Sequence, residues 1–400
     1  MLTIALIREG KSPADNRVAL TPAQCKWLKQ NSPEINILVQ PSPSRCFPDK
    51  DYSQAGAVIT DDIEKADILF GIKEVPKEQL IPNKTYLFFS HTKKAQPHNK
   101  ALMQEMVKKN ITLIDYECLT HDDGQRIIGF GFFAGIVGAH NGMMAYSTRT
   151  GKFNLGRVKD VRDYRQLIHT YFGLKIPPIK IAVTGSGRVA HGILEIMNLM
   201  GIHEVEPFDY LHKTYQYPVY VHLKGRDLYE RKDDGTYNRQ NFHDHPEEYR
   251  CSFSPYVKQT DILMNGVYWD KGIAPLFSIE EFKSPEFKVQ SIADITNDEG
   301  GSVPVNKGDS TIDEPVYGVD KSTLEKTKPY QPNSVDIIAV GNLPNELPRD
   351  ASRYFGEQLI KYIFEDLMKG SSPIIDRATI LKDGKLTKGY EYLKEYAGVL

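Results

Sequence analysis

The chain has 400 residues, of which 50 are basic and 52 acidic, so its formal net charge is −2. This length predicts two or three domains with sizeable cores. A nearly neutral chain has no basic field to hold a nucleic-acid backbone, so we expect no nucleic-acid partner. The four cysteines are scattered without a C-x-x-C pair, which favours reduced thiols in a cytoplasmic protein.

Two segments could be mistaken for export or membrane signals. The N-terminus reaches Arg8 and Glu9 too early for a secretory signal and predicts a first strand instead. Residues 127–146 contain no Asp, Glu, Lys or Arg, but five glycines, His140 and Asn141 make them a poor lipid-facing helix. We therefore predict no membrane partner and a segment buried between two domains, where small residues allow close backbone contact.

Residues 1–140 alternate short apolar runs with helical stretches. The predicted strands are 3–7, 35–39, 57–59, 68–72, 85–89 and 112–115, and the predicted helices or turns are 21–30, 78–80 and 97–108. Such alternation is typical of an α/β domain with a largely parallel sheet. Because active groups gather at the carboxyl ends of parallel strands, the residues after these runs are functional candidates.

Three such candidates are Arg17, Lys73 and His91. Arg17 precedes a helix that Thr21 would cap and Pro22 would open, and it either clamps a carboxylate or is a solvated surface arginine. Lys73 follows the apolar run 68–72 and could serve as a base or hold an anion. His91 follows four apolar residues and is either catalytic or structural.

Two further candidates follow the predicted strand 112–115. Glu117 could tune the pKa of a neighbouring lysine or histidine, or be a capped surface carboxylate. Arg126 opens the glycine-rich segment and is a second candidate for holding a substrate carboxylate.

The stretch 180–192 has the pattern of a dinucleotide-binding turn. A short apolar strand leads into glycines, and an apolar-periodic helix follows until Gly201. Such a turn lets the backbone approach a phosphate at the N-terminus of the helix. The cofactor-binding candidates here are Gly185, Ser186, Gly187, Arg188 and Val189, with Ala190 at the position of the third glycine.

The adenine ribose is expected at the end of a second strand that begins at Val205. Glu206 or Asp209 there would favour NAD by repelling a 2′-phosphate, whereas Arg188 or Lys213 could receive one. The choice between NAD and NADP stays open.

The predicted dinucleotide domain covers 141–334 and contains a Tyr- and His-rich insertion at 211–259. His243 and His245 flank Asp244, but no second ligand group follows at helical spacing, so no metal site is predicted. Later strands place further residues near a nicotinamide or substrate: Asn265, Gly266 and Tyr268 as cofactor-binding candidates and Asp294 as a substrate-binding candidate.

A last strand near 334–344 and an amphipathic helix at 351–368 are expected to return to the first domain. The predicted fold class is therefore α/β with two Rossmann-like domains, parallel sheets and an interdomain cleft. The dinucleotide domain is inserted in a substrate domain made of 1–140 and 335–400.

Several motifs together resemble the alanine dehydrogenase and transhydrogenase N-terminal superfamily. They are Arg-Val-Ala-Leu-Thr-Pro at 17–22, Lys-Glu at 73–74, Phe-Ser-His-Thr at 89–92 and Gly-Ser-Gly at 185–187. Finer motifs are similar to lysine–ketoglutarate reductase, the lysine-forming saccharopine dehydrogenase. These are 89–96, 113–117, 129–138, 265–269, 294–302, 311–313, 342–348 and 384–392.

This resemblance implies reversible NAD(P)-linked oxidative deamination of saccharopine to lysine and 2-oxoglutarate. It implies catalytic roles for Lys73 and His91, with Glu117 moderating their pKa values. Arg17 and Arg126 would hold substrate carboxylates. Asp294 would lie near the substrate amine or the nicotinamide.

The sequence departs from the family pattern at Ala190 and Gly192, and Lys11 matches loosely the basic residue upstream of Arg17. The length leaves no room for a second, glutamate-forming module, so a stand-alone reductase half is expected. Two alternatives remain: an alanine dehydrogenase-like or other opine-type amino acid dehydrogenase, and a dinucleotide-binding protein without chemistry. The physiological direction, the formation of a homo-oligomer and the job of the 211–259 insertion stay open.

Overall fold

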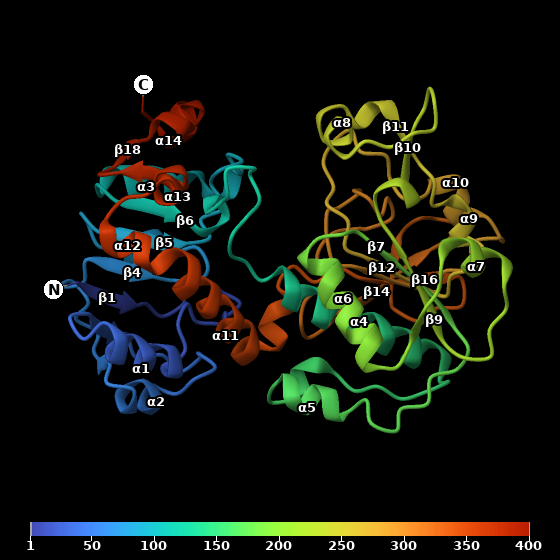
Figure 1. The fold of residues 1–400 in the computed structure, drawn as a ribbon, viewed down its shortest axis with the longest axis horizontal. Coiled ribbons are helices and arrows are strands. Elements are labelled where there is room, and N and C mark those ends of the chain that lie inside the picture. Colours follow the sequence, from blue (N-terminus) through green and yellow to red (C-terminus); the bar gives the residue numbers. More distant parts are fainter. Residues whose placement is uncertain (1, 400) are drawn as a thin grey trace. The chain divides into compact units, whose positions relative to one another are not determined.

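The computed structural model describes residues 2–399, which form two compact units. Unit 1 comprises residues 2–130 and 348–399, and unit 2 comprises residues 131–347 (Figure 1). The predicted α/β class, with two large and mostly parallel sheets, is confirmed. The predicted domain boundary at 140/141 falls inside one continuous helix, α4, whereas the compact units divide at 130/131.

Unit 1 is built on a sheet whose order is β18-β17-β6-β5-β4-β1-β2-β3. Strands β1 to β6 run parallel, and the β17–β18 hairpin adds an antiparallel edge. The strands are β1 Thr3–Leu6, β2 Asn36–Val39, β3 Val58–Ile59, β4 Ile68–Phe70, β5 Thr85–Phe88, β6 Thr112–Asp115, β17 Thr379–Lys382 and β18 Lys385–Leu386. The six strands predicted before residue 140 are thus confirmed, each within two residues at either end.

The helices of unit 1 include the segment that returns from residue 348. They are α1 Pro22–Asn31, α2 Asp49–Gln54, α3 Lys100–Lys108, α11 Pro348–Leu359, α12 Glu365–Lys369, α13 Pro373–Ala378 and α14 Lys394–Ala397. Thr21 caps α1 by accepting a hydrogen bond from the main chain of Gln24, as its sequence position predicts. A π-helical turn at Ile360–Phe364 joins α11 to α12, so the predicted helix 351–368 is interrupted by a wider turn.

Unit 2 repeats this plan with the sheet order β15-β14-β16-β13-β12-β7-β9-β8. Among the described strands of this sheet, only β14 runs against the others, and it pairs antiparallel with both β16 and β15. The strands are β7 Lys180–Thr184, β8 His203–Glu204, β9 Val219–Leu223, β12 Ile262–Asn265, β13 Ser291–Asp294, β14 Val316–Asp320, β15 Lys326–Thr327 and β16 Ser334–Ile338, with a separate hairpin of β10 Tyr229–Arg231 and β11 Tyr249–Cys251. The helices are α4 Gly131–Thr150, α5 Tyr164–His169, α6 Arg188–Leu199, α7 Pro207–His212, α8 Arg239–Asp244, α9 Ser254–Val257 and α10 Ile279–Lys283.

The glycine-rich helix α4 packs against α6 and the sheet of its own unit. A Cβ on Gly192 would lie 2.1 Å from the carbonyl oxygen of Phe132, and one on Gly135 would lie 2.1 Å from that of Val189. The two glycines therefore allow the helix backbones to touch. Contacts with α6 and the sheet of unit 2 thus contribute to the burial of α4, and the prediction that this segment lies between two domains stays a prediction.

Residues 211–259 are not simply an insertion outside the sheet. Strand β9 lies within this interval and pairs with β7 along its whole length, from Lys180 opposite Val219 to Thr184 opposite Leu223. The sequence pattern did not indicate β9, because Tyr220 and His222 interrupt its apolar residues. The antiparallel pair β10–β11 and the small helices α8 and α9 belong to the same interval and lie outside the main sheet.

Candidate active site

The carboxyl edge of the unit 1 sheet brings several predicted residues into neighbouring loops. Strands β1, β4, β5 and β6 are adjacent and parallel, so their carboxyl ends meet at one edge. The main-chain N–H of Phe89 donates to the carbonyl of Ile72 at 3.0 Å, which joins the ends of β4 and β5. Lys73 directly follows Ile72 in the chain, and His91 lies two residues after Phe89.

Glu74 connects the two loops through both of its carboxylate oxygens. Its Oε1 lies 2.7 Å from Nδ1 of His91, and its Oε2 accepts from Nζ of Lys11 at 2.8 Å. Burial alone would raise the Glu74 pKa, but the hydrogen bonds from His91 and Lys11 lower that pKa far below its ordinary value. The ionised carboxylate thus accepts the Nδ1 proton of His91, so a neutral ring exchanges protons through Nε2.

Lys73 lies on a loop that a second carboxylate holds in place. The two oxygens of Glu9 accept the main-chain N–H groups of Ile72 and Lys73 at 2.7 and 2.9 Å. Burial lowers the Lys73 pKa, and the positive charge of Arg17 lowers it further. Burial, with the negative charge of Asp15, raises the pKa of Glu9 to about 7. Both shifts favour the neutral form, of the amine at Lys73 and of the carboxyl group at Glu9. A neighbouring amine and carboxyl group with such shifts are suited to proton transfer.

Arg17 is only 4% exposed, which excludes the alternative of a solvated surface arginine. Its Nε and Nη2 donate to the two oxygens of Asp15 at 3.0 and 2.6 Å, and its guanidinium lies 4.2 Å from the ring centre of Phe130. That ring stacks on Phe355 at 4.5 Å. Asp15 and the aromatic pair therefore fix the plane of the guanidinium before any ligand binds.

Glu117 and Arg126 form an ion pair with each other at the partly exposed end of this edge. The residue of β6 that reaches the His91 loop is instead Asp115. Its Oδ2 accepts from the main-chain N–H of Ser90 at 3.0 Å, and its Oδ1 accepts from that of Glu117 at 2.7 Å. Asp115 thus sets the turn that precedes His91, while the predicted influence of Glu117 on a pKa stays a prediction.

Sequence reasoning missed the structural roles of Glu9, Asp15 and Asp115. Glu9 and Asp115 stand at or just after the carboxyl ends of predicted strands. The expectation that active groups gather at such ends, which selected Lys73, therefore applies to them as well. No pattern in the sequence points to Asp15, because its pairing with Arg17 depends on the conformation of the loop.

In unit 2 the predicted glycine turn connects β7 to α6. Gly185 has φ +105°, and a Cβ there would lie 2.4 Å from the carbonyl oxygen of Gly266, so both conformation and space require glycine. Gly187 precedes α6 without any side-chain cap, and a Cβ on it would meet nothing within 4 Å. A bare helix N-terminus beside open space fits the pyrophosphate of a dinucleotide.

Ser186, Arg188 and Val189 belong to the same turn and first helical residues. Val189 also packs toward Gly266, since a Cβ on Gly266 would lie 2.9 Å from Cγ1 of Val189. Tyr268 follows β12 and is 62% exposed. The structure therefore gathers the predicted cofactor residues from 185–189 and 266 at one place, and their contacts with a cofactor stay predictions.

Asn265 and Asp294 form a buried polar network at the ends of β12 and β13. Nδ2 of Asn265 donates to Oδ1 of Asp294 at 2.8 Å and to Oγ of Ser302 at 2.7 Å, while its Oδ1 accepts from Thr184 at 2.7 Å. Nδ2 of Asn306 donates to the other oxygen of Asp294 at 2.8 Å. Burial raises the pKa of Asp294 to about 6. The network holds the three strand ends together, which is a structural role that the sequence did not reveal.

The expected second strand of the nucleotide fold is not where the sequence placed it. The strand after α6 is β8, which ends at Glu204 and lies at the sheet edge, whereas β9 lies between β8 and β7. Glu206 precedes α7, and Asp209 lies within α7 and pairs with Lys213 at 2.7 Å. The geometric basis for choosing Glu206 or Asp209 as the ribose ligand is therefore wrong, because neither follows the strand next to β7.

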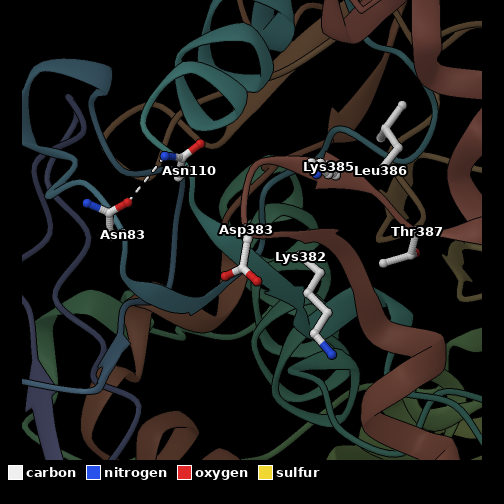
Figure 2. A pocket seen from close by; sticks show the side chains of 7 residues that line it. All are labelled: Asn83, Asn110, Lys382, Asp383, Lys385, Leu386 and Thr387. Atoms are coloured by element: carbon white, nitrogen blue, oxygen red, sulfur yellow. Dashed lines mark hydrogen bonds between the residues drawn. The ribbon is translucent and has the colours of Figure 1, made fainter.

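Two other features of the described residues lie apart from these groups. A cavity of about 620 Å³ beside the β17–β18 hairpin is lined by Asn83, Asn110, Lys382, Asp383, Lys385, Leu386 and Thr387. Figure 2 shows the Asn110–Asn83 hydrogen bond across it, and the cavity contains none of the predicted site residues. His245, Glu247 and Glu248 have ligand atoms within 4.8 Å of one another at the surface of unit 2.

The fold defines a class of protein before any particular relative is considered. Residues 5–137 match the family model described as the alanine dehydrogenase/PNT N-terminal domain. An L-alanine dehydrogenase structure aligns with 99% of this chain and 99% of its own at a TM-score of 0.66 and 15% identity. A transhydrogenase from Sinorhizobium meliloti aligns with 96% of this chain at a TM-score of 0.60 and 14% identity. The chain therefore has the fold of these dehydrogenases.

Among particular proteins, the chain is homologous to L-lysine-forming saccharopine dehydrogenases and to alpha-aminoadipic semialdehyde synthases. It is 31% identical to the rat mitochondrial alpha-aminoadipic semialdehyde synthase over 98% of this chain and 47% of that protein. It is 26% identical to the NAD(+)-dependent, L-lysine-forming saccharopine dehydrogenase of Candida glabrata over 93% of this chain and 94% of that protein. The chain thus spans about half the length of the synthases that it matches. Among residues 2–399, no helix combines the length and apolar character needed to cross a membrane.

Proposed function

We propose that the protein is an NAD(P)-dependent oxidoreductase that interconverts saccharopine with lysine and 2-oxoglutarate. The observation that carries this proposal is the alignment of nearly the whole chain with L-lysine-forming saccharopine dehydrogenases. The charged strand ends of unit 1 and the glycine turn of unit 2 support it, because the reaction needs both proton transfer and a bound nicotinamide.

Lys73 and His91 are the proposed catalytic residues. Joining the lysine amine to the oxo acid forms a carbinolamine, which must gain one proton and lose another before it becomes an imine. The lowered pKa of Lys73 makes its amine available as a base, and the hydrogen bond to Glu74 orients the His91 ring so that Nε2 can exchange a proton. Glu117 is proposed to moderate these pKa values through its charge.

Substrate carboxylates are proposed to bind Arg17 and Arg126. The fixed guanidinium plane of Arg17 suits bidentate binding of a carboxylate, and a substrate with several carboxylates requires more than one such partner. Asp294 is proposed to act near the substrate amine or the nicotinamide.

The turn 185–189 and residues 265, 266 and 268 are proposed to hold the dinucleotide. When bound, this cofactor supplies or accepts the hydride, and the protein supplies orientation and a dry site. Hydride transfer requires nicotinamide and substrate to meet, so the interdomain cleft predicted from the sequence is retained as part of the proposal. A cytoplasmic location is also proposed.

A spectrophotometric screen tests the reaction. NADH and NADPH oxidation are followed with 2-oxoglutarate while lysine, alanine, ornithine and ammonia are offered in turn, and then with pyruvate and ammonia. We expect turnover with lysine and 2-oxoglutarate. Turnover with pyruvate and ammonia instead would favour an alanine dehydrogenase, and nucleotide binding without turnover of any amine and oxo acid pair would favour a protein without chemistry.

A further inference from the structure

Strand β9 brings its carboxyl end directly beside the glycine turn. Gly185 donates its main-chain N–H to the carbonyl of Leu223, the last residue of β9, at 3.0 Å. Nε2 of His222 lies 2.7 Å from the carbonyl oxygen of Gly185. The residues that follow Leu223 therefore begin next to the turn that is proposed to hold the pyrophosphate.

In dinucleotide-binding sheets, the strand beside the first strand ends at the adenine ribose, and NAD-specific sites carry an acidic residue there. Here β9 occupies that place, and the first residue after it is Lys224, followed two residues later by Arg226. A cavity of about 450 Å³ opens at this point and is lined by Glu206, His222, Lys224, Arg226 and Asp227, among others. Two cations thus stand where an NAD site would place a carboxylate.

The carboxylates around this cavity have other positions or partners. Glu204 accepts the hydroxyl of Tyr220 at 3.0 Å, and Asp227 approaches the main-chain N–H of Lys224 at 3.4 Å. Glu206 follows β8, one strand further from Gly185 than Lys224 is. Within residues 2–399, neither Lys224 nor Arg226 forms an ion pair with a protein carboxylate, and both side chains are exposed.

We propose that Lys224 and Arg226 bind the 2′-phosphate of the adenine ribose, so that the protein uses NADP(H) in preference to NAD(H). This inference rests on the proposed dinucleotide site at Gly185 and adds the residues that select the cofactor. The planar guanidinium of Arg226 can donate two hydrogen bonds to a phosphate, and the ammonium of Lys224 adds a point charge.

Direct binding tests the inference without relying on turnover. Isothermal titration calorimetry of the full chain measures dissociation constants for NADPH, NADH and the fragments adenosine 2′,5′-bisphosphate and 5′-AMP. We expect each 2′-phosphorylated ligand to bind roughly tenfold to a hundredfold more tightly than its counterpart, in line with charge-assisted hydrogen bonds. In the double variant Lys224→Ser/Arg226→Ser, NADPH affinity should fall to that of NADH, while NADH affinity should be unchanged or slightly improved.

The matched control is Lys258→Ser, which removes an exposed cation of the same unit that already pairs with Glu286. This variant should keep the preference for NADPH. Loss of that preference in Lys258→Ser alone would overturn the assignment to Lys224 and Arg226. A wild-type preference for NADH would overturn the inference while leaving the proposed function intact. Failure of both dinucleotides to bind would overturn the proposed function together with the inference.

Discussion

The two units share a plan but differ in what stands at the carboxyl ends of their strands. Each has a parallel sheet with an antiparallel hairpin at one edge, β17–β18 in unit 1 and β14–β15 in unit 2. The strand ends of unit 1 carry charged groups such as Glu9, Lys73 and Glu74. Those of unit 2 carry glycines and a network of amides around Asp294.

This difference follows from what each site is proposed to handle. Moving protons needs titratable groups whose pKa values depend on burial and neighbouring charges, as at Lys73. Holding a dinucleotide needs backbone N–H groups and close approach, as at Gly185. Substitutions at the proposed catalytic groups of unit 1 should therefore act through charge, and those at the glycines of unit 2 should act through shape.

The largest expected effect is on catalysis in unit 1. Lys73→Met removes the proposed base, so kcat should fall by about 10²- to 10⁴-fold, the usual contribution of general acid–base catalysis. NADPH affinity, measured by calorimetry, should stay unchanged. The control Lys65→Met alters an exposed lysine of the same unit and should keep full turnover. A Lys73→Met protein with near-normal kcat would refute the catalytic role.

The pH comparison concerns one carboxyl group in each unit. Burial raises the pKa of Glu9 in unit 1 and of Glu346 in unit 2 to about 7. Two glutamate ¹³C-carboxyl resonances should therefore titrate near pH 7, one missing in Glu9→Gln and the other in Glu346→Gln. If both variants retained both resonances, these two assignments would be wrong.

The sign of the linked stability change follows from these raised pKa values. Between the ordinary value of 4.5 and about 7, the folded protein keeps protons on these groups that the unfolded chain has lost. Their contribution to stability therefore falls as pH rises through this window and is level above it.

A shape change in unit 2 should destabilise it without any change in charge. Gly192→Ala would force a Cβ to within 2.1 Å of the Phe132 carbonyl oxygen and push α6 from α4, which we expect to destabilise unit 2 by about 1–3 kcal/mol. Urea unfolding followed by Trp269 fluorescence in a Trp27→Phe background measures this. Asn198→Ala, on the exposed side of α6, should change stability by less than about 0.5 kcal/mol.

The smallest expected effect tests whether the turn at 185–189 binds the pyrophosphate. A Cβ on Gly187 meets no protein atom within 4 Å, so Gly187→Ala should leave unfolding by urea unchanged. It should nevertheless weaken dinucleotide binding by roughly tenfold, because the methyl group occupies space that backbone approach to a phosphate requires. Gly156→Ala, which also has open space, should change neither quantity. Unaltered NADPH affinity in Gly187→Ala would place the pyrophosphate elsewhere.

The sequence by itself determined the α/β class and the strands before residue 140, because local apolar runs and turn residues specify such elements directly. It also determined the glycine turn at 185–187, since few residues other than glycine adopt the backbone conformation found at Gly185. The alternation of apolar runs with helical stretches likewise placed Lys73 and His91 after the ends of strands.

Tertiary structure alone decided which strand lies next to β7. Chain order predicts β8, but spatial order gives β9, because strand pairing joins residues that are distant in sequence. The pairing of Glu74 with His91 and of Asp15 with Arg17, and the pKa shifts that burial causes, depend in the same way on contacts between separate segments. Local sequence specifies backbone conformation, whereas neighbours, burial and the electrostatics that follow from them exist only once the sheets have formed.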